Sequence, residues 1–200
     1  MKEDSEADGE LKLLLSSVRA CTLCQDLPLG PNPIFQLNSE AKILIVGQAP
    51  GKITHAKNIP FDDPSGKRLR EWMGIDREVF YDESKVAILP MAFCYPGTGE
   101  GGDLPPRKEC SEKWRELLLA RLVNVELTLV IGRYAMEWHL PNNQAATLTE
   151  TVLSWQDYWP LQVPMPHPSP RNARWLKNND WFSIELLPVL KERIAVLLDH

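Results

Sequence analysis

The sequence predicts an α/β protein, a three-layer α/β/α sandwich built on a four-stranded, mostly parallel sheet. Two observations support this prediction. Four short apolar runs have the pattern of strands buried in a sheet, and they span residues 43–46, 86–91, 127–131 and 160–166. Helical patterns alternate with these runs, and this alternation is typical of a parallel sheet with helices on its faces.

Length and composition indicate an ordinary globular protein. The 200 residues suit one domain with a single core, and 44% of them are hydrophobic and 24% charged. No apolar run approaches the roughly 20 residues that span a bilayer, and the acidic start lacks the layout of a signal peptide. We therefore expect a cytoplasmic, monomeric protein with no membrane partner.

The net charge of −5 is concentrated at the N-terminus. Residues 1–10 contain five acidic residues and one lysine, which leaves a net charge of −1 for residues 11–200. We expect residues 1–10 to form a flexible acidic tail and residues 11–200 to form the single domain. A domain this close to neutral can have a local basic face. It does not have the generally basic surface of a protein that binds DNA through its overall charge.

The domain is expected to begin with a helix. Apolar residues between Leu11 and Val18 recur at helical spacing, which predicts a short amphipathic helix ending near Ala20. Proline and glycine then concentrate in residues 28–33, as expected for a loop that leads to the first strand.

The first strand ends in a turn that favours a ligand site. Residues 47–51 read Gly-Gln-Ala-Pro-Gly, and two glycines with a proline force a sharp turn with exposed backbone N–H groups. In open α/β sheets, ligands bind at the carboxyl ends of the strands. The turn lacks the glycine pattern of a dinucleotide-binding motif and the Gly-Lys-Ser/Thr of a P-loop. Taken alone, it is better explained as an ordinary tight turn.

A second loop, residues 59–66, is expected to lead into a helix. Asp63 is suited to cap this helix and Pro64 to occupy its first position. Leu69 and Trp72 recur at helical spacing and are expected on its buried face.

Residues 94–110 are rich in glycine and proline and are expected to be irregular. An irregular segment of this length in a compact domain usually has a function or a tether. A helix is expected over residues 111–122, with Trp114, Leu117 and Leu118 facing the core.

The rest of the chain is expected to hold two more helices and one rigid loop. A helix is predicted over residues 133–140, and residues 167–172 form a proline-rich loop. The closing helix is expected near residues 180–198, kinked or interrupted at Pro188.

The four cysteines form two pairs, C-x2-C at Cys21 and Cys24 and C-x15-C at Cys94 and Cys110. Four thiolates can hold a [4Fe–4S] cluster or a tetrahedral zinc ion, and the spacing does not distinguish the two. A disulfide is disfavoured in the cytoplasm. A metal site would anchor both long loops to the domain; the alternative is four unrelated buried thiols.

Taken together, five motifs resemble those of the uracil-DNA glycosylase superfamily, and within it the iron–sulfur (family 4) type. They are the two cysteine pairs, the turn at residues 47–51, Pro60-Phe61 and His167-Pro168-Ser169. The resemblance runs from about Arg19 to the C-terminus. It implies a four-stranded parallel sheet, a structural cluster and base-excision repair of DNA that contains a damaged base. The implied reaction is hydrolysis of the N-glycosidic bond of a flipped-out base, with uracil as the default.

The resemblance assigns roles to the motif residues. Gly47, Ala49 and Phe61 would bind the flipped base, with the phenylalanine ring stacked on it. His167 would donate a hydrogen bond to a base carbonyl and stabilise the departing anion. Read without the resemblance, Phe61 is a candidate core residue and His167 a candidate packing residue.

The loop Pro168-Ser169-Pro170-Arg171 resembles the wedge that enters the duplex as the base leaves. Its prolines keep it stiff, so little ordering entropy is lost on binding. Residues 167–179 contain three basic residues, Arg171 and Arg174 among them, and no acidic one, which suits phosphate contacts. The competing interpretation is a solvated basic face.

Three features depart from the family-4 pattern, and two of them concern the activation of water. Gln48 stands where a glutamate is usual, and Thr54 and His55 stand where an acidic pair is usual. A neutral amide can position water but cannot remove its proton. We therefore hypothesise that His55, Asp62 or Asp63 takes part in activating the water.

The third departure concerns the choice of base. Pro90 aligns with the asparagine that reads the base in the family. Proline has neither a side-chain amide nor an N–H, so the expected reader of the uracil edge is missing. A site without such a polar contact discriminates poorly or selects another base, and the sequence leaves the target base open.

Two other functions compete with a glycosylase. A catalytically weak nucleic-acid-binding protein with the same fold and cluster is favoured by Gln48 and Pro90, and would bind DNA without producing abasic sites. A nucleotide- or small-molecule-binding protein that uses residues 47–51 is disfavoured by the wedge-like loop. Thermal stabilisation by nucleotides would favour it again.

Overall fold

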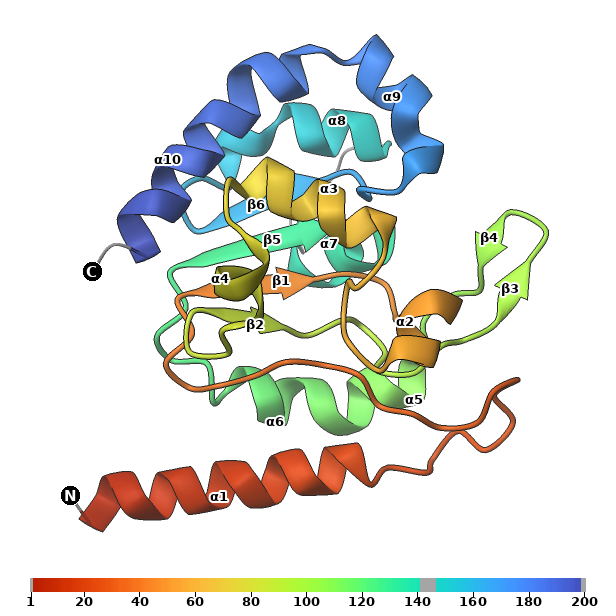
Figure 1. Cartoon of the computed structure of the whole chain (residues 1–200), viewed down its shortest axis with the longest axis vertical. Helices are drawn as coiled ribbons and strands as arrows, with labels where there is room; N and C mark the ends of the chain where they lie inside the picture. Colours follow the sequence, from red (N-terminus) through yellow and green to blue (C-terminus); the bar gives the residue numbers. More distant parts are fainter. Residues whose placement is uncertain (1, 141–146, 199–200) are drawn as a thin grey trace.

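The computed structural model describes residues 2–140 and 147–198 (Figure 1). Its central sheet has four strands in the order β2-β1-β5-β6, and every neighbouring pair is parallel. The strands are β1 (Ile43–Val46), β2 (Val86–Ile88), β5 (Leu127–Ile131) and β6 (Gln162–Met165). The predicted four-stranded sheet is confirmed, and it is parallel throughout.

Helices cover both faces of this sheet. The helices are α1 (Lys2–Arg19), α2 (Lys52–Lys57), α3 (Pro64–Met73), α4 (Arg77–Tyr81), α5 (Lys108–Cys110), α6 (Glu116–Leu119), α7 (Arg133–His139), α8 (Leu148–Leu153), α9 (Ala173–Asn178) and α10 (Leu187–Leu198). Short π-helical segments are η1 (Ser111–Arg115) and η4 (Phe182–Leu186), and short 3-10 segments are η2 (Trp155–Asp157) and η3 (Pro170–Asn172).

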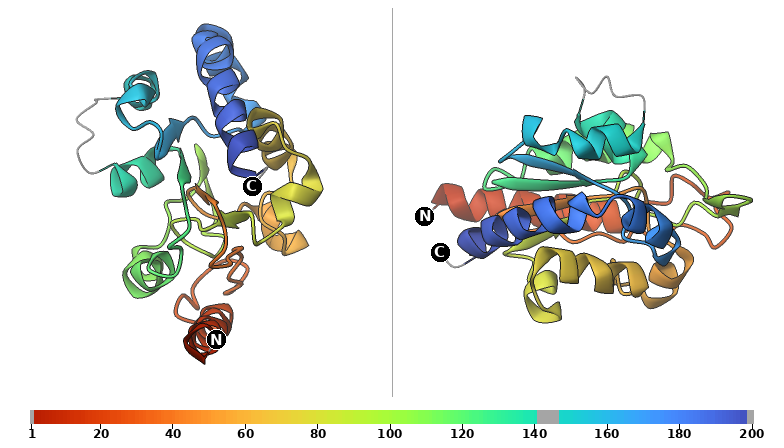
Figure 2. Two further views of the ribbon diagram at one scale, coloured as in Figure 1. Left: turned by 90° about the vertical axis from the view of Figure 1, so that its left-hand side faces the viewer. Right: turned by 90° about the horizontal axis from the view of Figure 1, so that it is seen from above.

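The layers form the predicted α/β/α sandwich (Figure 2). Helices α3 and α10 pack together on one face of the sheet, and α6, α7 and α8 lie on the other, with α1 beyond α6. All residues of β1, β2 and β5 are buried, which explains why these strands read as continuous apolar runs. No helix within residues 2–140 or 147–198 is long and apolar enough to cross a membrane.

The second strand is shorter than predicted. It ends at Ile88 rather than continuing to residue 91. Pro90 has no N–H to donate, and Met91 then bonds beyond the end of β1, because its N–H donates to the Gly47 carbonyl at 2.8 Å. The Leu89 N–H still donates to the carbonyl of Ile45 at 2.9 Å, and this bond keeps the departing chain beside β1.

The first helix begins earlier than predicted. Helix α1 starts at Lys2, so residues 2–10 of the expected acidic tail belong to it, and residue 1 lies outside the described residues. Its sequence is rich in Glu, Leu and Lys, which are strong helix formers, and this propensity outweighs the polar composition. The predicted C-terminal end near Ala20 is confirmed, because α1 ends at Arg19.

Residues 94–110 are not irregular throughout, which corrects the prediction. They contain a two-stranded antiparallel hairpin, β3 (Thr98–Gly99) with β4 (Gly102–Asp103), and end in α5. Gly102 has φ of 136°, a conformation open to glycine but rarely to other residues, and it permits the tight return of the chain. The glycines that indicated an irregular segment in the sequence therefore build the turn.

The helix predicted over residues 111–122 is displaced and has a different buried face. A continuous helical run extends from α5 through η1 to α6, ending at Leu119. Trp114 and Leu118 are buried as predicted, but Leu117 is 53% exposed. The π-helical turn of η1 contains more than 3.6 residues, and this shifts the buried face of the helix. Leu118, four residues after Trp114, therefore faces the core, whereas Leu117, three residues after it, faces solvent.

The closing helical run changes type next to Pro188 and is not interrupted there. The π-helical segment η4 ends at Leu186, and α10 begins at the residue before Pro188. A proline removes one backbone donor, and a π-bulge accommodates that loss without ending the helical run.

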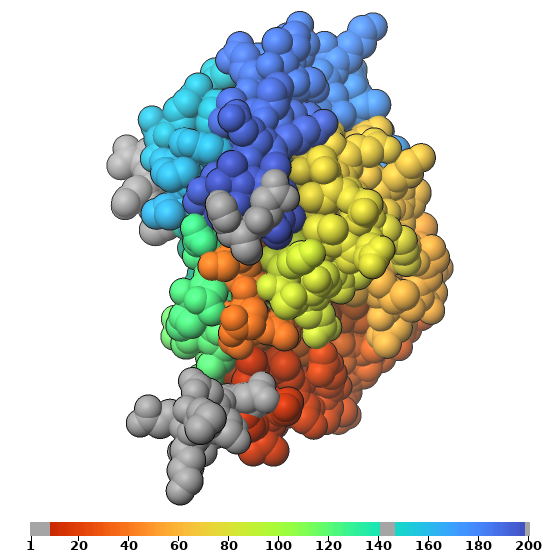
Figure 3. Space-filling view, turned by 60° about the vertical axis from the view of Figure 1, so that its left-hand side comes forward, coloured from red at the N-terminus to blue at the C-terminus, as the bar shows by residue number. Residues whose placement is uncertain are grey.

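The two edges of the sheet differ in character. Because all four strands are parallel, their carboxyl ends meet at one edge, where α2 and the β3–β4 hairpin also lie (Figure 1). The opposite edge carries the loops that lead into the strands, and these loops lie between α1 and α10 (Figure 3). Ligand sites in open α/β sheets form at the carboxyl edge.

Candidate functional site

A cleft of about 1600 Å³, counting its opening to solvent, lies at the carboxyl edge of the sheet. The turn after β1, the start of α3, the β3–β4 hairpin and the loop after β6 line it. The predicted site residues that line it are Gly47, Gln48, Ala49, Phe61, Asp63, Pro90, His167, Ser169, Pro170 and Arg171. Those outside its lining are His55, Asp62, Pro168 and Arg174.

Phe61 lies in the cleft in a constrained backbone conformation. Its φ is 54°, in the left-handed region that residues other than glycine rarely adopt. The ring is directed toward the turn after β1, because its Cζ atom lies 3.8 Å from the point where a Cβ on Gly47 would stand. The ring also meets Phe80 edge to face, with centroids 6.3 Å apart. The aromatic face predicted to stack on a base therefore lines the cleft.

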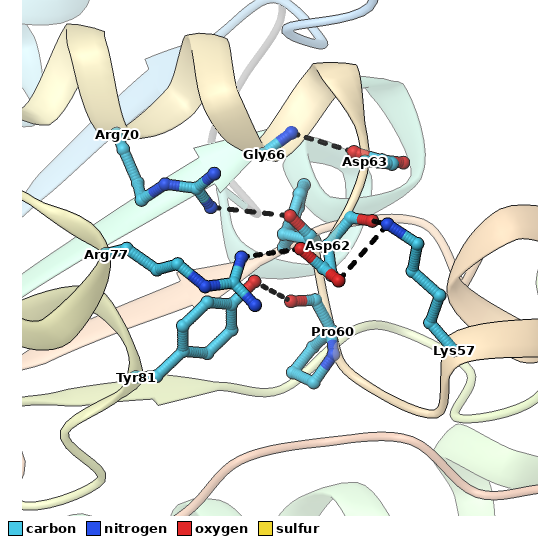
Figure 4. Close-up of polar contacts among 9 residues, drawn as sticks. Lys57, Pro60, Asp62, Asp63, Gly66, Arg70, Arg77 and Tyr81 are labelled. Atoms are coloured by element: carbon cyan, nitrogen blue, oxygen red, sulfur yellow. Dashed lines mark hydrogen bonds and ion pairs between the residues drawn. The ribbon is translucent and has the colours of Figure 1, made fainter.

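Contacts to backbone carbonyls hold this loop in place (Figure 4). The Tyr81 hydroxyl donates to the Pro60 carbonyl at 2.9 Å, and Arg70 donates to the Phe61 carbonyl at 3.5 Å. Gly66 approaches the same carbonyl so closely that a Cβ there would lie 1.7 Å from its oxygen. These contacts sustain the left-handed conformation of Phe61.

Asp62 belongs to the scaffold of the loop and not to the cleft. Its carboxylate pairs with Arg77 at 2.5 Å and with Lys57 at 3.2 Å (Figure 4). The hydrogen bond from Arg77 lowers the pKa of this carboxyl, and Lys57 adds to the effect. Because its oxygens are directed at these two cations outside the cleft, Asp62 is not placed to activate water, which corrects the hypothesis above.

Asp63 combines a structural contact with a place in the cleft. Its Oδ1 atom accepts a hydrogen bond from the Gly66 N–H at 2.8 Å, and Pro64 occupies the first position of α3. The predicted helix cap is therefore confirmed. The carboxylate also acts electrostatically on His167 across the cleft.

His167 is a neutral imidazole with a defined tautomer. Burial lowers its pKa, while the charges of Asp63 and Asp103 act in the opposite direction. The Ser169 N–H donates to His167 Nδ1 at 3.1 Å, which makes Nδ1 the acceptor and leaves the proton on Nε2. A neutral imidazole with Nε2–H can donate a hydrogen bond to a carbonyl or to a developing anion.

The loop after His167 is braced from both sides. Arg68 donates to the Ser169 carbonyl at 2.9 Å, and Asn172 donates to the His167 carbonyl at 2.8 Å. Pro168 is buried beneath the loop, whereas Pro170 and Arg171 are exposed. Pro168 therefore supports the predicted wedge without belonging to its surface, because its side chain packs inward.

His55 is placed away from the cleft. It lies on α2 with its ring edge toward Tyr95, at a centroid distance of 6.2 Å. Its Nδ1 atom is buried and has no hydrogen-bond partner among the described residues. The hypothesis that His55 activates water is therefore not supported, because α2 turns this side chain away from the cleft that holds Phe61 and His167.

Gln48 bonds to the β3–β4 hairpin. Its Nε2 atom donates to the carbonyls of Asp103 at 3.2 Å and Leu104 at 2.7 Å. The amide thereby fixes the hairpin over the turn after β1. Asp103 also lines the cleft, and sequence reasoning missed it. The one sequence feature that could have identified Asp103 is that it is an acidic residue within the glycine-rich segment 94–110.

The floor of the cleft at Pro90 is held by a buried arginine that the sequence did not reveal. Arg115 donates through Nη1 to the carbonyls of Pro90 at 2.9 Å and Leu89 at 3.3 Å. Its guanidinium carbon lies 4.9 Å from the centre of the Trp138 ring, and Nη2 bonds to His139 Nε2. Burial lowers the pKa of Arg115 to about 10, so it stays charged at neutral pH.

The Arg115–His139 contact predicts acid sensitivity. Burial, with the charge of Arg115, lowers the pKa of His139 to about 3. The pKa of His139 in the folded protein lies below its value near 6.5 in the unfolded chain. The contribution of the neutral ring to the free energy of unfolding is therefore full above about pH 6.5, and it declines as the pH falls toward about 3. We expect a slope of up to about 1.4 kcal/mol per pH unit in that window. Urea unfolding at several pH values measures it, and His139→Gln should flatten the slope; an unchanged slope would contradict the assignment.

All four cysteines line a second, shallow cavity of about 380 Å³, counting its opening to solvent. Burial raises the pKa of the Cys110 thiol to about 12, and the other cysteines add to this effect. The Phe93 N–H lies 3.4 Å from the Cys110 sulfur, and the Trp114 Nε1–H lies 3.3 Å from the Cys21 sulfur. N–H groups directed at sulfur are typical of the surroundings of thiolate-ligated clusters.

This set of four thiols has the ligand number of a [4Fe–4S] cluster and of a tetrahedral zinc ion. Among the residues that the structure describes, no three His, Cys, Asp or Glu side chains form a ready-made site for one metal ion. The two cysteine pairs, far apart in the sequence, meet at this shared cavity.

The chain matches a known protein family over most of its length. The family profile of the "Uracil DNA glycosylase superfamily" matches residues 34–191. Among solved structures, the solution NMR structure of a candidate uracil DNA glycosylase from Methanosarcina acetivorans matches with 15% identity and a TM-score of 0.47, covering 80% of this chain and 98% of that one. The profile spans most of the chain, including both the Phe61 loop and the His167 loop, and the protein is therefore a member of the uracil DNA glycosylase superfamily.

Proposed function

We propose that the protein is a DNA glycosylase that hydrolyses the N-glycosidic bond of a damaged or deaminated base flipped into the cleft. One observation carries the proposal: a constrained aromatic ring, Phe61, and a neutral imidazole donor, His167, line the same cleft. Enzymes that act on a base must remove it from the stack and hold it by stacking and edge hydrogen bonds.

The cleft offers groups for each part of this reaction. The ring of Phe61 provides the stacking face, and the adjacent Gly47 has no side chain to block it. The Nε2–H of His167 can donate to a base carbonyl as negative charge develops on the leaving base. Such a preorganised donor stabilises the transition state more than the ground state.

The rim of the cleft suits the DNA backbone. Ser169, Pro170 and Arg171 stand at its edge in a loop braced by Arg68. Arg171 reaches toward the hairpin, since its Nη1 atom lies 3.3 Å from the position of a Cβ on Gly102. A stiff loop that ends in an arginine supports our assignment of this segment as the wedge beside the extruded base.

The target base is open, with uracil as the family default. Pro90 provides no side-chain donor at the floor of the cleft, and its carbonyl is engaged by Arg115. The experiment that tests the proposal uses a panel of labelled oligonucleotides, each carrying uracil, hypoxanthine, xanthine or an oxidised or alkylated pyrimidine. Alkali-dependent strand cleavage with one base identifies the substrate.

A second candidate is a nucleic-acid-binding protein with little catalytic power. It is favoured by the bonding of Gln48, whose amide donates to two hairpin carbonyls, and by Pro90. This protein would bind duplex DNA and leave every base of the panel in place. If protein with its four-cysteine site filled removes no base of the panel, this candidate is favoured over the glycosylase.

We also propose that the four cysteines hold a structural [4Fe–4S] cluster, with zinc as the alternative. Cys110→Ser is expected to abolish the visible absorbance of the cluster and to lower stability by several kcal/mol, because cluster binding is coupled to folding. Iron, sulfide and zinc analysis of purified protein measures the loading. Zinc in place of iron and sulfide would contradict the cluster, and Ser111→Ala, next to Cys110, serves as the control that should keep full loading.

A further inference from the structure

The proposed glycosylase reaction needs a group that accepts a proton from water, and Gln48 cannot provide it. An amide is not a base at neutral pH. Its nitrogen is, moreover, committed to the carbonyls of Asp103 and Leu104. The chain must therefore supply a carboxylate or a neutral imidazole from another position in the cleft.

Few titratable groups line the cleft. Within the described residues, its charged or titratable lining groups are Asp63, Asp103, His167 and Arg171. His167 carries its proton on Nε2 and accepts the Ser169 N–H at Nδ1, so neither ring nitrogen is free to take a proton. Arg171 has no acceptor. The two carboxylates remain.

Asp63 is committed to the cap of α3. Its Oδ1 atom accepts the Gly66 N–H at 2.8 Å and thereby caps the helix that follows the Phe61 loop. Protonation of this carboxylate would weaken the cap that also holds the Phe61 loop. Asp63 is therefore a structural carboxylate at the side of the cleft.

Asp103 has a different arrangement. Its Oδ1 atom accepts a hydrogen bond from Thr98 Oγ1 at 3.2 Å, and that hydroxyl lies 2.5 Å from the hydroxyl of Tyr95. Its Oδ2 atom lies 3.4 Å from the point where a Cβ on Gly51 would stand, so it faces the turn after β1. One oxygen is thus oriented by Thr98, and the other is directed over the ligand-binding edge of the sheet.

We propose that Asp103, held over the turn by Gln48, is the carboxylate that activates the attacking water, and that Gln48 is its positioning residue. This inference rests on the proposed glycosylase function. As the C1′–N bond breaks, its electron pair leaves with the base, and the water oxygen forms the C1′–O bond. One water proton passes to Asp103 Oδ2 and then to the released base anion, which regenerates the carboxylate.

The test measures single-turnover cleavage and DNA affinity on the base that the panel identifies. Asp103→Asn is expected to lower the rate about 100-fold with unchanged affinity, because general-base catalysis contributes at least that factor. It should also remove the acid limb of the pH–rate profile. Glu100→Gln, in the same hairpin but outside the lining of the cleft, should match the wild type.

Further variants separate the roles. Gln48→Ala should lower the rate but keep the acid limb, because the carboxylate remains while its position loosens. An Asp103→Asn protein that cleaves at the wild-type rate, while His167→Ala is inactive, would overturn the role of Asp103 and leave the glycosylase proposal standing. A wild type that cleaves no base would overturn both. Circular dichroism and the melting temperature confirm that each variant is folded.

Discussion

Replacing Gly66 with alanine is expected to displace the Phe61 loop and to remove most of the activity. A Cβ at this position would lie 1.7 Å from the Phe61 carbonyl oxygen and 2.6 Å from its carbon, and both are backbone atoms. The loop must therefore move by more than about 1 Å, a displacement that can cost about 100-fold in rate. Overpacking of this kind also costs about 1–3 kcal/mol of stability.

Gly9→Ala is the matched control for this substitution. Gly9 lies in α1, and a Cβ there meets nothing within 4 Å. Alanine should stabilise that helix by up to about 1 kcal/mol and leave activity intact. Single-turnover rates and melting temperatures of both variants provide the measurement. A fully active Gly66→Ala protein would show that Phe61 does not need its observed position.

Replacing His167 with alanine is expected to lower the cleavage rate by about 100- to 1000-fold, the usual effect of removing one preorganised donor to a developing anion. DNA affinity should change little, because the wedge loop is braced independently by Arg68 and Asn172. The rate at saturating enzyme and the dissociation constant for uncleaved DNA separate the two effects. Equal losses in rate and affinity would instead assign His167 to ground-state binding.

The pH dependence of the wild type provides a second test of His167. Burial lowers its pKa, so the imidazole stays neutral as pH falls through its ordinary value of about 6.5. We therefore expect that lowering the pH through about 6.5 does not change wild-type activity through protonation of His167. Any change in rate near that pH should also occur in His167→Ala. A change that is lost in His167→Ala would show that the protonated form, and not the neutral donor, takes part in the reaction.

The parts of the fold that follow local rules were predictable from the sequence. The strands β1 and β5 match their predicted bounds, because a strand buried on both faces leaves a continuous apolar run. The cap at Asp63 was also predictable, since it depends on residues that adjoin it along the chain. The exposure of Leu117 was not, because a π-helical turn changes the period on which the prediction relied.

The cleft was predictable only where its residues sit in recognisable motifs. Phe61 and His167 were identified in this way, and both line it. Asp62 and His55 lie in the same motif regions, yet their side chains do not line the cleft. The direction of a side chain cannot be predicted from its closeness to a motif along the chain. Asp103 is brought to the cleft by a hairpin that the sequence did not predict, more than fifty residues from Gln48.

The positions of α1 and α10 have a practical consequence for measurement. The first turn of α1 and the last turn of α10 lie on the same side of the molecule, away from α2 and the β3–β4 hairpin (Figure 1). A tag or fluorophore attached next to either of these turns would therefore stand clear of the carboxyl edge of the sheet. The protein can be tethered to a surface through this side while the cleft remains accessible, so the proposed cleavage of DNA can be followed on immobilised protein.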